Sequence, residues 1–334
     1  MEALTGTYTA KKTKEHPVWR DEKGRKETEI SIMGGAGKTE LWDAAAGAVL
    51  LFGAVISVLA VTALFFYVVS NGIPALKEVG MGEALFGTVW KPVAADPRYG
   101  MLQMILASLA GAFLAALIGM PIGVLTAVFL VEISGKRAAG TVRAAVELLA
   151  GIPSVVYGLL GVYLLNPLMY RLELKLFADS PAHRFTGGAN LLSASLVLAV
   201  MILPTVINVS ETAIRRVSPD IRAASLALGA SQVQTVFRVV LPAARSGIAA
   251  AVVLGLGRAL GEATAVMLVA GNSVDIPLPF HSVRFLTTTI VSEMGYSHGI
   301  HRQMLFTMGL VLFLLIMLFN MLLGRSLRKG GQSG

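Results

Sequence analysis

Long apolar runs alternate with short polar segments along this chain. Six windows stay mostly apolar for at least about 18 residues, the length that an α-helix needs to cross the hydrocarbon core of a bilayer. These windows are 44–70, 103–131, 141–167, 190–212, 244–271 and 303–325. The pattern predicts an all-α integral membrane protein with six transmembrane helices in one domain, 44–325. A charged, flexible N-terminal tail (1–43) and a short basic C-terminal tail (326–334) would flank it.

Composition supports the same class and adds an orientation. Charged residues make up 14% of the chain and the mean hydropathy is +0.71, whereas soluble domains contain about 25% charged residues. Most of the 28 Lys and Arg residues fall in the two tails and in the loops 132–143 and 211–245. Positive loops stay on the cytoplasmic side, so we expect a multi-pass cell-membrane protein with both termini cytoplasmic.

The net charge of +8 is therefore assigned to a basic cytoplasmic face beside membrane lipid, and not to nucleic-acid binding. The external loops would be 71–102, 167–189 and 272–302, which carry mixed charge and suit contact with a soluble outer partner. The chain contains no Cys, which excludes disulfides and thiolate chemistry.

Small residues recur at helical spacing in two of the spans. The second span carries them every four residues, at Gly111, Ala115, Gly119, Gly123 and Ala127. The fifth carries Gly247, Ala251 and Gly255. Such stripes let helix backbones approach closely in a membrane. Pro121, Pro153 and Pro204 each remove a helical hydrogen bond and are expected to bend spans two, three and four.

Two charged residues lie in the middle of the fifth apolar run. Arg258 and Glu262 are one turn apart, and hydrocarbon solvates neither charge. One interpretation is an ion pair between residues i and i+4 that neutralises itself and joins two helices. The other is a passage for an anion, in which Arg258 supplies positive charge and Glu262 holds or gates it. Thr264 and Asn272 lie further along the same run and are weaker candidates for the passage.

The polar loop before this run predicts a pair of short helices that do not span the membrane. Ser218 fits an N-cap followed by Pro219, and Gly229 fits the end of the first helix. Ser231 with Gln234 fits a capping box for the second helix, which Pro242 would stop. The pair is either an amphipathic segment on the membrane surface or a lever gripped by a cytoplasmic subunit; the helix–Gly–helix shape favours the lever.

Two other motifs are weak. The segment Gly34–Thr39 is similar to a phosphate-binding loop, but Ile32 stands where that motif requires glycine, and a membrane span follows in place of a nucleotide domain. His281, His298 and His301 lie close together in the last outer loop, where surface histidines are favoured over a metal site. We expect no catalytic residues, no bound metal and no cofactor on this chain.

The cytoplasmic loop resembles the EAA loop of ABC importer permeases, whose pattern is Glu-Ala-Ala, three residues, Gly, nine residues, Ile-x-Leu-Pro. The matching positions are Ala223, Ala224, Ser225, Gly229, Val239, Leu241 and Pro242. Ala223 stands where the family usually has Glu, and Val239 replaces Ile. The resemblance implies docking on an ATPase, without the carboxylate that could form a salt bridge from the first position.

A second resemblance is more specific. The run from Gly255 to Val266, with Gly271-Asn272 after it, is similar to the PstC family of phosphate importer permeases, where it commonly reads GLGRALGETMAV…GN. Ala263 and Thr264 replace Thr and Met of that pattern. The segment Glu147–Gly158 is also typical of phosphate permeases. The resemblance covers about 44–325 and leaves the N-terminal tail outside.

The resemblance implies a type I (MetI-like) importer permease that translocates phosphate and is not itself an enzyme. Its partners would be a second phosphate permease (PstA-like), ATPase subunits (PstB-like) that bind ATP-Mg, and an extracytoplasmic phosphate-binding protein (PstS-like). Other oxyanions, such as sulfate, molybdate or phosphonate, stay open as substrates. An ATP-independent secondary transporter or channel would leave the helix–Gly–helix loop unexplained. A membrane-embedded enzyme would require paired His or metal-ligand spacing, which the spans lack.

Overall fold

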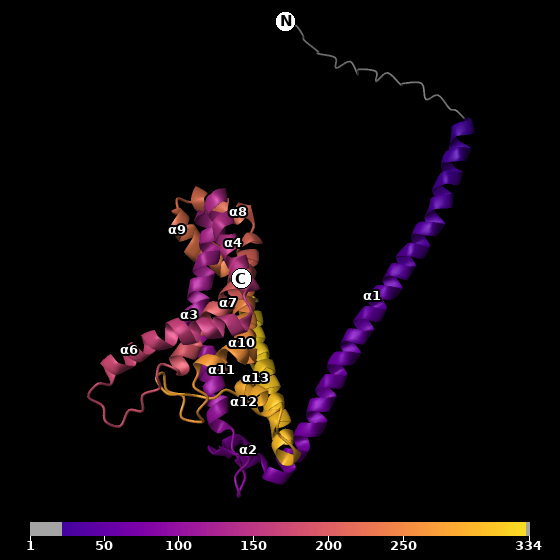
Figure 1. The fold of residues 1–334 in the computed structure, drawn as a ribbon. Coiled ribbons are helices and arrows are strands. Elements are labelled where there is room, and N and C mark those ends of the chain that lie inside the picture. Colours follow the sequence, from indigo (N-terminus) through magenta and orange to yellow (C-terminus); the bar gives the residue numbers. More distant parts are fainter. Residues whose placement is uncertain (1–21, 332–334) are drawn as a thin grey trace. The chain divides into compact units, whose positions relative to one another are not determined.

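The computed structural model describes residues 22–331, with side chains at Trp42 and over 44–321 (Figure 1). It consists of two units, Met1–Leu64 and Phe65–Gly334, which are described separately. Six segments in the described residues are long and apolar enough to cross a membrane, which confirms the predicted number. They are Ala44–Val79, Leu102–Ile133, Ser154–Leu176, Leu191–Arg215, Gln232–Gly261 and Gly299–Met321.

The predicted N-terminal tail differs from the expectation where the structure describes it. Helix α1 covers Glu22–Val79 and so begins inside the charged segment that was expected to be flexible. Gly34–Thr39 is helical, unlike the loop that a phosphate-binding site requires. At the other end, α13 extends over Gly299–Gly331. The rest of the two predicted tails, 1–21 and 332–334, lies outside the described residues.

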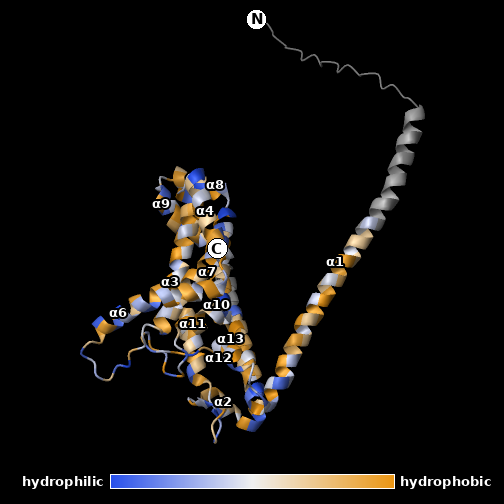
Figure 2. Cartoon of the chain, in the orientation of Figure 1, coloured by the Kyte–Doolittle hydropathy of each residue, from blue (hydrophilic) through white to orange (hydrophobic). Residues whose placement is uncertain are grey.

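The second unit is organised around α7, Leu191–Arg215. Helix α3, Leu102–Val128, and helix α10, Leu241–Gly261, pack along it. The other helices are α4 Lys136–Gly151, α5 Ser154–Leu160, α6 Asn166–Leu176, α8 Pro219–Ala227, α9 Gln232–Thr235 and α11 Thr264–Val269. Figure 2 shows apolar residues along the surfaces of the long helices as well as between them, as expected where lipid covers a helix.

The predicted small-residue stripe of α3 lies against α7. All five of its residues are buried. A Cβ at Gly119 would lie 2.9 Å from the carbonyl oxygen of Ala199, and one at Gly123 would lie 2.7 Å from Cγ1 of Val206. Glycine is therefore needed at these positions because two backbones approach each other closely there.

The stripe of α10 lies against the same helix. Gly247 contacts Ala213, and a Cβ at Gly255 would lie 3.1 Å from Cγ2 of Val206. Ala251 is fully buried. Helix α7 is thus held between two small-residue faces, which fixes the distance and rotation of α10 relative to it.

One end of the second unit is built from shorter elements. Helix α2, Met81–Phe86, is followed by the strands β1, Trp90–Lys91, and β2, Arg98–Tyr99, which pair antiparallel with Trp90 opposite Tyr99. Helix α12, Leu286–Glu293, packs on the start of α13. Four methionines fill the core between these elements: Met101, Met104, Met304 and Met308. Figure 1 shows α8 and α9 at the opposite end of this unit.

The third and fifth predicted spans are wrong in one respect, because each is interrupted. The third breaks at Ile152, which is extended (ψ 125°) before Pro153, so that α4 ends and α5 begins a new direction. Proline disfavours the helical conformation of the residue before it. The fifth breaks at Glu262, which is also extended (ψ 127°), and α11 follows as a separate helix.

A Gly119→Ala substitution tests the close approach of α3 to α7. Alanine normally favours a helix over glycine by up to about 1 kcal/mol. Here the added methyl would press on the backbone of α7, and we expect a net loss of about 1–3 kcal/mol. The matched control is Gly140→Ala in α4, where the added methyl meets no atom within 4 Å. The melting temperature in detergent should fall for the first variant and hold or rise for the second; equal changes would contradict the packing argument.

Candidate functional site

Arg258 lies on an exposed face of α10. Its Nη1 donates to Oγ1 of Thr205 on α7 at 3.4 Å. No carboxylate among the described side chains lies within 4 Å of its guanidinium. Gly257 and Gly261 flank it, and an added Cβ at either would meet no atom within 4 Å. This part of α10 is therefore a cationic, open surface within the apolar stretch that follows Gly247.

Glu262 does not pair with Arg258, so of the two interpretations of these residues the i, i+4 ion pair is wrong. Helix α10 ends at Gly261, and the extended backbone of Glu262 removes it from the helical position that the pair requires. Its Oε1 instead accepts the backbone N–H of Ala265 at 3.1 Å, which caps the first turn of α11. Its carbonyl oxygen accepts the hydroxyl of Thr287 at 2.8 Å. Glu262 thus holds the break between two helices together.

The two broken spans meet in the second unit. Helix α5 packs against α11, and a Cβ at Gly158 would lie 3.0 Å from Cα of Ala265. Across the first break, the hydroxyl of Tyr157 donates to the carbonyl oxygen of Leu149 at 2.7 Å. Thr264 begins α11 and is half-buried. Each interrupted span therefore has a side chain that satisfies a backbone group freed by its break, as a membrane interior requires.

Asn272 fixes the other end of α11. It adopts a left-handed backbone (φ 59°), which asparagine tolerates better than most residues. Its side-chain amide donates to the carbonyl oxygen of Met267 at 2.6 Å, and its own carbonyl oxygen accepts Nε of Arg284 at 2.9 Å. Of the four candidate passage residues, Arg258 alone presents an exposed charge, whereas Glu262 and Asn272 hold the two ends of α11. No hydrogen bond joins any of the four to another.

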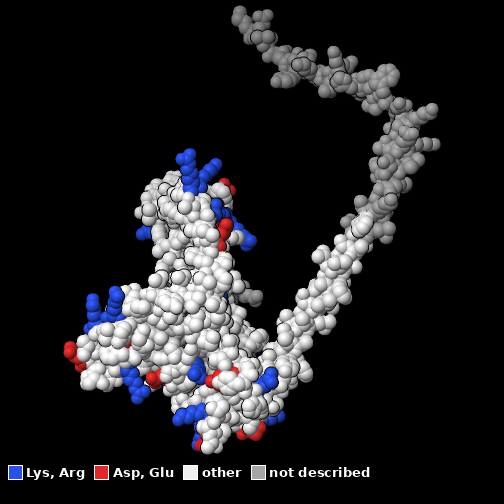
Figure 3. Space-filling view, viewed as in Figure 1, with Lys and Arg blue, Asp and Glu red and all other residues white. Residues whose placement is uncertain are grey.

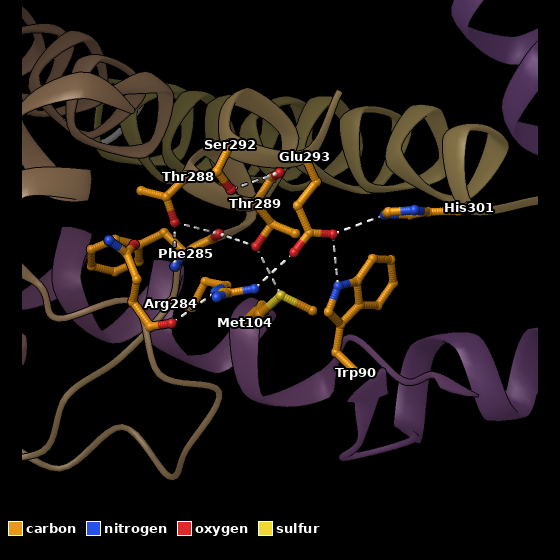
Figure 4. Close-up of polar contacts among 10 residues, drawn as sticks. Trp90, Met104, Arg284, Phe285, Thr288, Thr289, Ser292, Glu293 and His301 are labelled. Atoms are coloured by element: carbon orange, nitrogen blue, oxygen red, sulfur yellow. Dashed lines mark hydrogen bonds and ion pairs between the residues drawn. The ribbon is translucent and has the colours of Figure 1, made fainter. Parts of the chain in front are cut away.

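Figure 4 shows a buried polar cluster around Glu293 that the sequence analysis missed. Oε2 of this carboxylate lies 3.0 Å from Nε1 of Trp90 and 2.9 Å from Nε2 of His301, and Oε1 accepts Nη1 of Arg284 at 2.8 Å. Since Arg284 also binds Asn272, the cluster anchors the end of α11 to α12, α13 and β1. Trp90 and Glu293 are 203 residues apart in the sequence, so no local spacing could reveal the contact.

The three histidines between residues 281 and 301 do not form one group. His281 lies 3.7 Å from Asp275, whereas His301 is buried against Glu293, so the surface interpretation is wrong for His301. No group of three or more His, Asp or Glu residues that could hold a metal ion occurs among the described residues.

The predicted caps of the polar loop are confirmed. The side chain of Ser218 accepts the N–H of Asp220, and Ser231 with Gln234 forms the capping box. Gly229 has a left-handed backbone (φ 87°) after α8. The predicted stop at Pro242 is wrong, because a π-helical turn over Val236–Val240 leads directly into α10. Proline is accepted there because it falls in the first turn of α10, next to a turn whose hydrogen bonds are already shifted.

The loop is attached on one side and open on the other. An ion pair of 3.0 Å joins Arg222 to Glu132 in the π-helical turn Phe129–Ile133 that follows α3, and the hydroxyls of Ser225 and Thr235 lie 2.9 Å apart. Leu228 is 90% exposed and Val233 is 67% exposed. The family-motif positions follow the same division: Ala223, Ala224, Gly229 and Pro242 are exposed, and Ser225, Val239 and Leu241 are half-buried. Figure 3 shows Lys and Arg gathered around this end of the unit and an uncharged band beyond it.

Known proteins match most of this chain. A family model described as "Binding-protein-dependent transport system inner membrane component" matches residues 119–329. The chain is 37% identical to the "Probable ABC transporter permease protein YqgH" of Bacillus subtilis, over 81% of this chain and 86% of that protein. It is 32% identical to the "Phosphate transport system permease protein PstC" of Haemophilus influenzae, over 79% of this chain and 86% of that protein.

One solved structure supports the fold. It is the crystal structure of a bacterial ABC transporter involved in the import of the acidic polysaccharide alginate, which matches with a TM-score of 0.56 at 16% identity. The match covers 87% of this chain and 99% of that one. At this identity the likeness concerns the arrangement of helices alone.

Removal of the Glu293 carboxylate tests the buried cluster. A Glu293→Ala variant removes a buried carboxylate and leaves the half-buried Arg284 without its partner, and breaking a pair of this kind costs up to about 3–5 kcal/mol. We expect a lower melting temperature in detergent and faster tryptic cleavage after Arg284. Glu83→Ala is the control, because Glu83 pairs with Arg98 on an exposed surface and its loss should change little. A Glu293→Ala variant as stable as this control would show that the cluster does not anchor α11 to α12, α13 and β1.

Proposed function

This chain belongs to the family of binding-protein-dependent transport system inner membrane components, and from that premise we propose that it translocates inorganic phosphate. Membership makes it a multi-pass permease subunit of an ABC importer with the type I fold. Such a subunit carries out no catalysis itself and works with a second permease, ATPase subunits and a substrate-binding protein.

The substrate proposal is supported by relatives and by one structural observation. Relatives named as phosphate permeases include the Haemophilus influenzae protein and PstC 1 of Mycobacterium tuberculosis, which is 35% identical over 80% of this chain. The observation that carries the proposal is the exposed Arg258 on a membrane-spanning helix, without a carboxylate partner among the described residues. A guanidinium in that position is costly unless something anionic or polar reaches it.

Phosphate carries one to two negative charges, and its oxygens accept hydrogen bonds from a guanidinium in a bidentate geometry. In this proposal Arg258 compensates that charge at membrane depth, and Thr205 orients the guanidinium on α7. Glu262, Thr264 and Asn272 support the passage by positioning α11 beside it. Glu262 is then a cap rather than a gate, because its carboxylate is engaged by the backbone of α11.

The proposed partners are a PstA-like second permease, PstB-like ATPase subunits that bind ATP-Mg, and a PstS-like phosphate-binding protein. We place both termini and the 219–242 loop in the cytoplasm, where the exposed side chains of α8 and α9 would dock on an ATPase. ATP binding would move this loop, and the continuous helix from α9 through α10 would carry the movement to Arg258. The permease pair would then alternate between outward- and inward-facing states.

An uptake assay with the reconstituted complex distinguishes phosphate import from two alternative functions. A permease for sulfate, molybdate or phosphonate would share the fold and the cationic helix. A secondary transporter or channel would move its substrate without ATP, and would leave the exposed apolar loop without a role.

We expect Arg258→Gln to abolish most ATP-dependent uptake of labelled phosphate by the complex in proteoliposomes. Loss of one charged hydrogen-bonding contact is worth about 1.5–3 kcal/mol, or a fall of roughly tenfold or more. Arg258→Lys keeps the charge and should retain part of the activity. Unchanged uptake in Arg258→Gln would remove Arg258 from the passage.

Sulfate and molybdate serve as competitors in the same assay. Phosphate uptake that neither anion blocks supports the phosphate assignment. If the complex transports another oxyanion and not phosphate, the permease assignment stands and the substrate is corrected.

The docking role of the loop is tested at Leu228. A Leu228→Asp variant should reduce the amount of ATPase subunit that co-purifies with the permease, because an apolar contact of about 1–3 kcal/mol is lost and a charge is introduced. The control is Val93→Asp, since Val93 is 81% exposed at the other end of the second unit. Equal co-purification of the two variants would favour a membrane-surface role for the loop.

A further inference from the structure

A cavity of about 670 Å³ lies where α7 ends and α8 begins. Its wall comes from α7, from the residues that join α7 to α8, from the start of α8 and from the first turns of α10. The polar lining consists of Asn208, Thr212, Arg216, Ser218 and Ser246. The cavity therefore opens beside the loop that we assign to the cytoplasmic side.

The cavity shares a helix face with Arg258. On α7, residues at helical spacing lead from the Arg258 contact to the cavity: Thr205, Asn208, Thr212 and Arg216. On α10 the same spacing leads back from Arg258 through Leu254 and Ala250 to Gly247. Since an α-helix rises about 1.5 Å per residue, Thr205 and Arg216 are about 16 Å apart along α7. One polar stripe thus connects the passage residue to the cavity.

The charge of the lining is positive. Arg216 is exposed, no Asp or Glu lines the cavity, and no described carboxylate lies within 4 Å of the Arg216 guanidinium. The nearest acidic residue on α7, Glu211, is already occupied, because its Oε1 accepts Nη2 of Arg143 at 2.7 Å and Nη2 of Arg215 at 2.8 Å. The positive charge of Arg216 is therefore not cancelled by the protein side chains described around it.

Hydrogen-bonding groups of the lining are also available. The Asn208 amide and the Ser246 hydroxyl make no hydrogen bond to any described residue, and both side chains are exposed. Thr212 donates its hydroxyl proton to the carbonyl oxygen of Asn208 at 2.9 Å, so its oxygen can accept only from a protonated oxygen of the anion. Small residues of α10, Ala243, Gly247 and Ala250, form the facing wall and leave room for a tetrahedral anion.

We propose that this cavity is the inner half of the anion route and that Arg216 is a second anion site at its mouth. The proposal rests on the proposed function and adds residues to it. In the inward-facing state the anion must leave Arg258, and a second cationic site further along the route would favour release because neither site then needs to bind tightly. Arg216 lies beyond the screening length of about 8 Å from Arg258, so it would attract the anion separately in a hydrated cavity. If the cavity is not part of an anion route, a segment of the second permease would fill it.

An introduced thiol tests access to the cavity, because the chain contains no Cys. Thr212→Cys would be reacted with an anionic and a cationic methanethiosulfonate in the assembled complex, made with cysteine-free partners. We expect about tenfold faster reaction with the anionic reagent, slower reaction when phosphate is present, and loss of the preference in an Arg216→Gln background. Val200→Cys is the control, since Val200 lines an apolar groove on another face of α7 and should show no preference.

Several outcomes would overturn the proposal. A thiol that reacts in the purified chain but with neither reagent in the complex would show that the second permease fills the cavity. Equal rates for the two reagents, unaffected by phosphate or by Arg216→Gln, would show that no anion is attracted there. Protection of the thiol by sulfate or molybdate in place of phosphate would instead support the route and would change only the assigned substrate.

Transport by the reconstituted complex gives a second readout. Arg216→Gln should lower phosphate uptake per ATP hydrolysed by about tenfold, and Arg216→Lys should restore part of it. Arg245→Gln is the matched control. Arg245 is an exposed arginine near the start of α10, but its side chain does not line the cavity. If the wild type imports phosphate and both glutamine variants match it, the proposed function stands and the route through Arg216 falls.

Discussion

The close contact of α7 with α3 and α10 is the constraint on which the rest of the structure depends. Gly119 and Gly255 allow backbones to approach α7 from two sides, so α10 has no freedom to rotate about its axis. The fixed orientation of α10 places Arg258 beside Thr205. It also turns the open face at Gly257 and Gly261 away from the chain's own core. A lone cation is thereby held at membrane depth on a surface that another molecule must cover or hydrate.

The interruptions of two spans follow from the same need to satisfy polar groups without water. A break in a membrane helix frees backbone N–H and C=O groups, and each must find a partner inside the protein. Tyr157 supplies a donor at one break, while Glu262 supplies an acceptor and Thr287 a donor at the other. The carboxylate of Glu262 is therefore committed to the fold, which explains why it does not neutralise Arg258.

Local signals were sufficient for much of this architecture. Hydrophobic runs predicted six spans, and small-residue spacing predicted the packing faces of α3 and α10, because both depend on residues a few positions apart. The caps at Ser218 and Ser231 were predictable for the same reason. The break at Ile152 had a local signal in Pro153, which we interpreted as a bend. The break at Glu262 and the cluster around Glu293 depend on Thr287, Trp90 and other residues far away in the sequence, so no spacing rule could find them.

Two glutamates near the proposed route are bound elsewhere in the fold, which leaves two arginines on this route without a carboxylate partner. Glu211 and Glu262 are both engaged, by Arg143 and Arg215 in one case and by the start of α11 in the other. Arg216 and Arg258 consequently keep their positive charge along one side of the α7–α10 pair. In the proposed route, two uncompensated guanidiniums on this face would attract an anion and repel a cation. The arrangement favours an anion that moves between weakly coupled sites over one that is held at a single tight site.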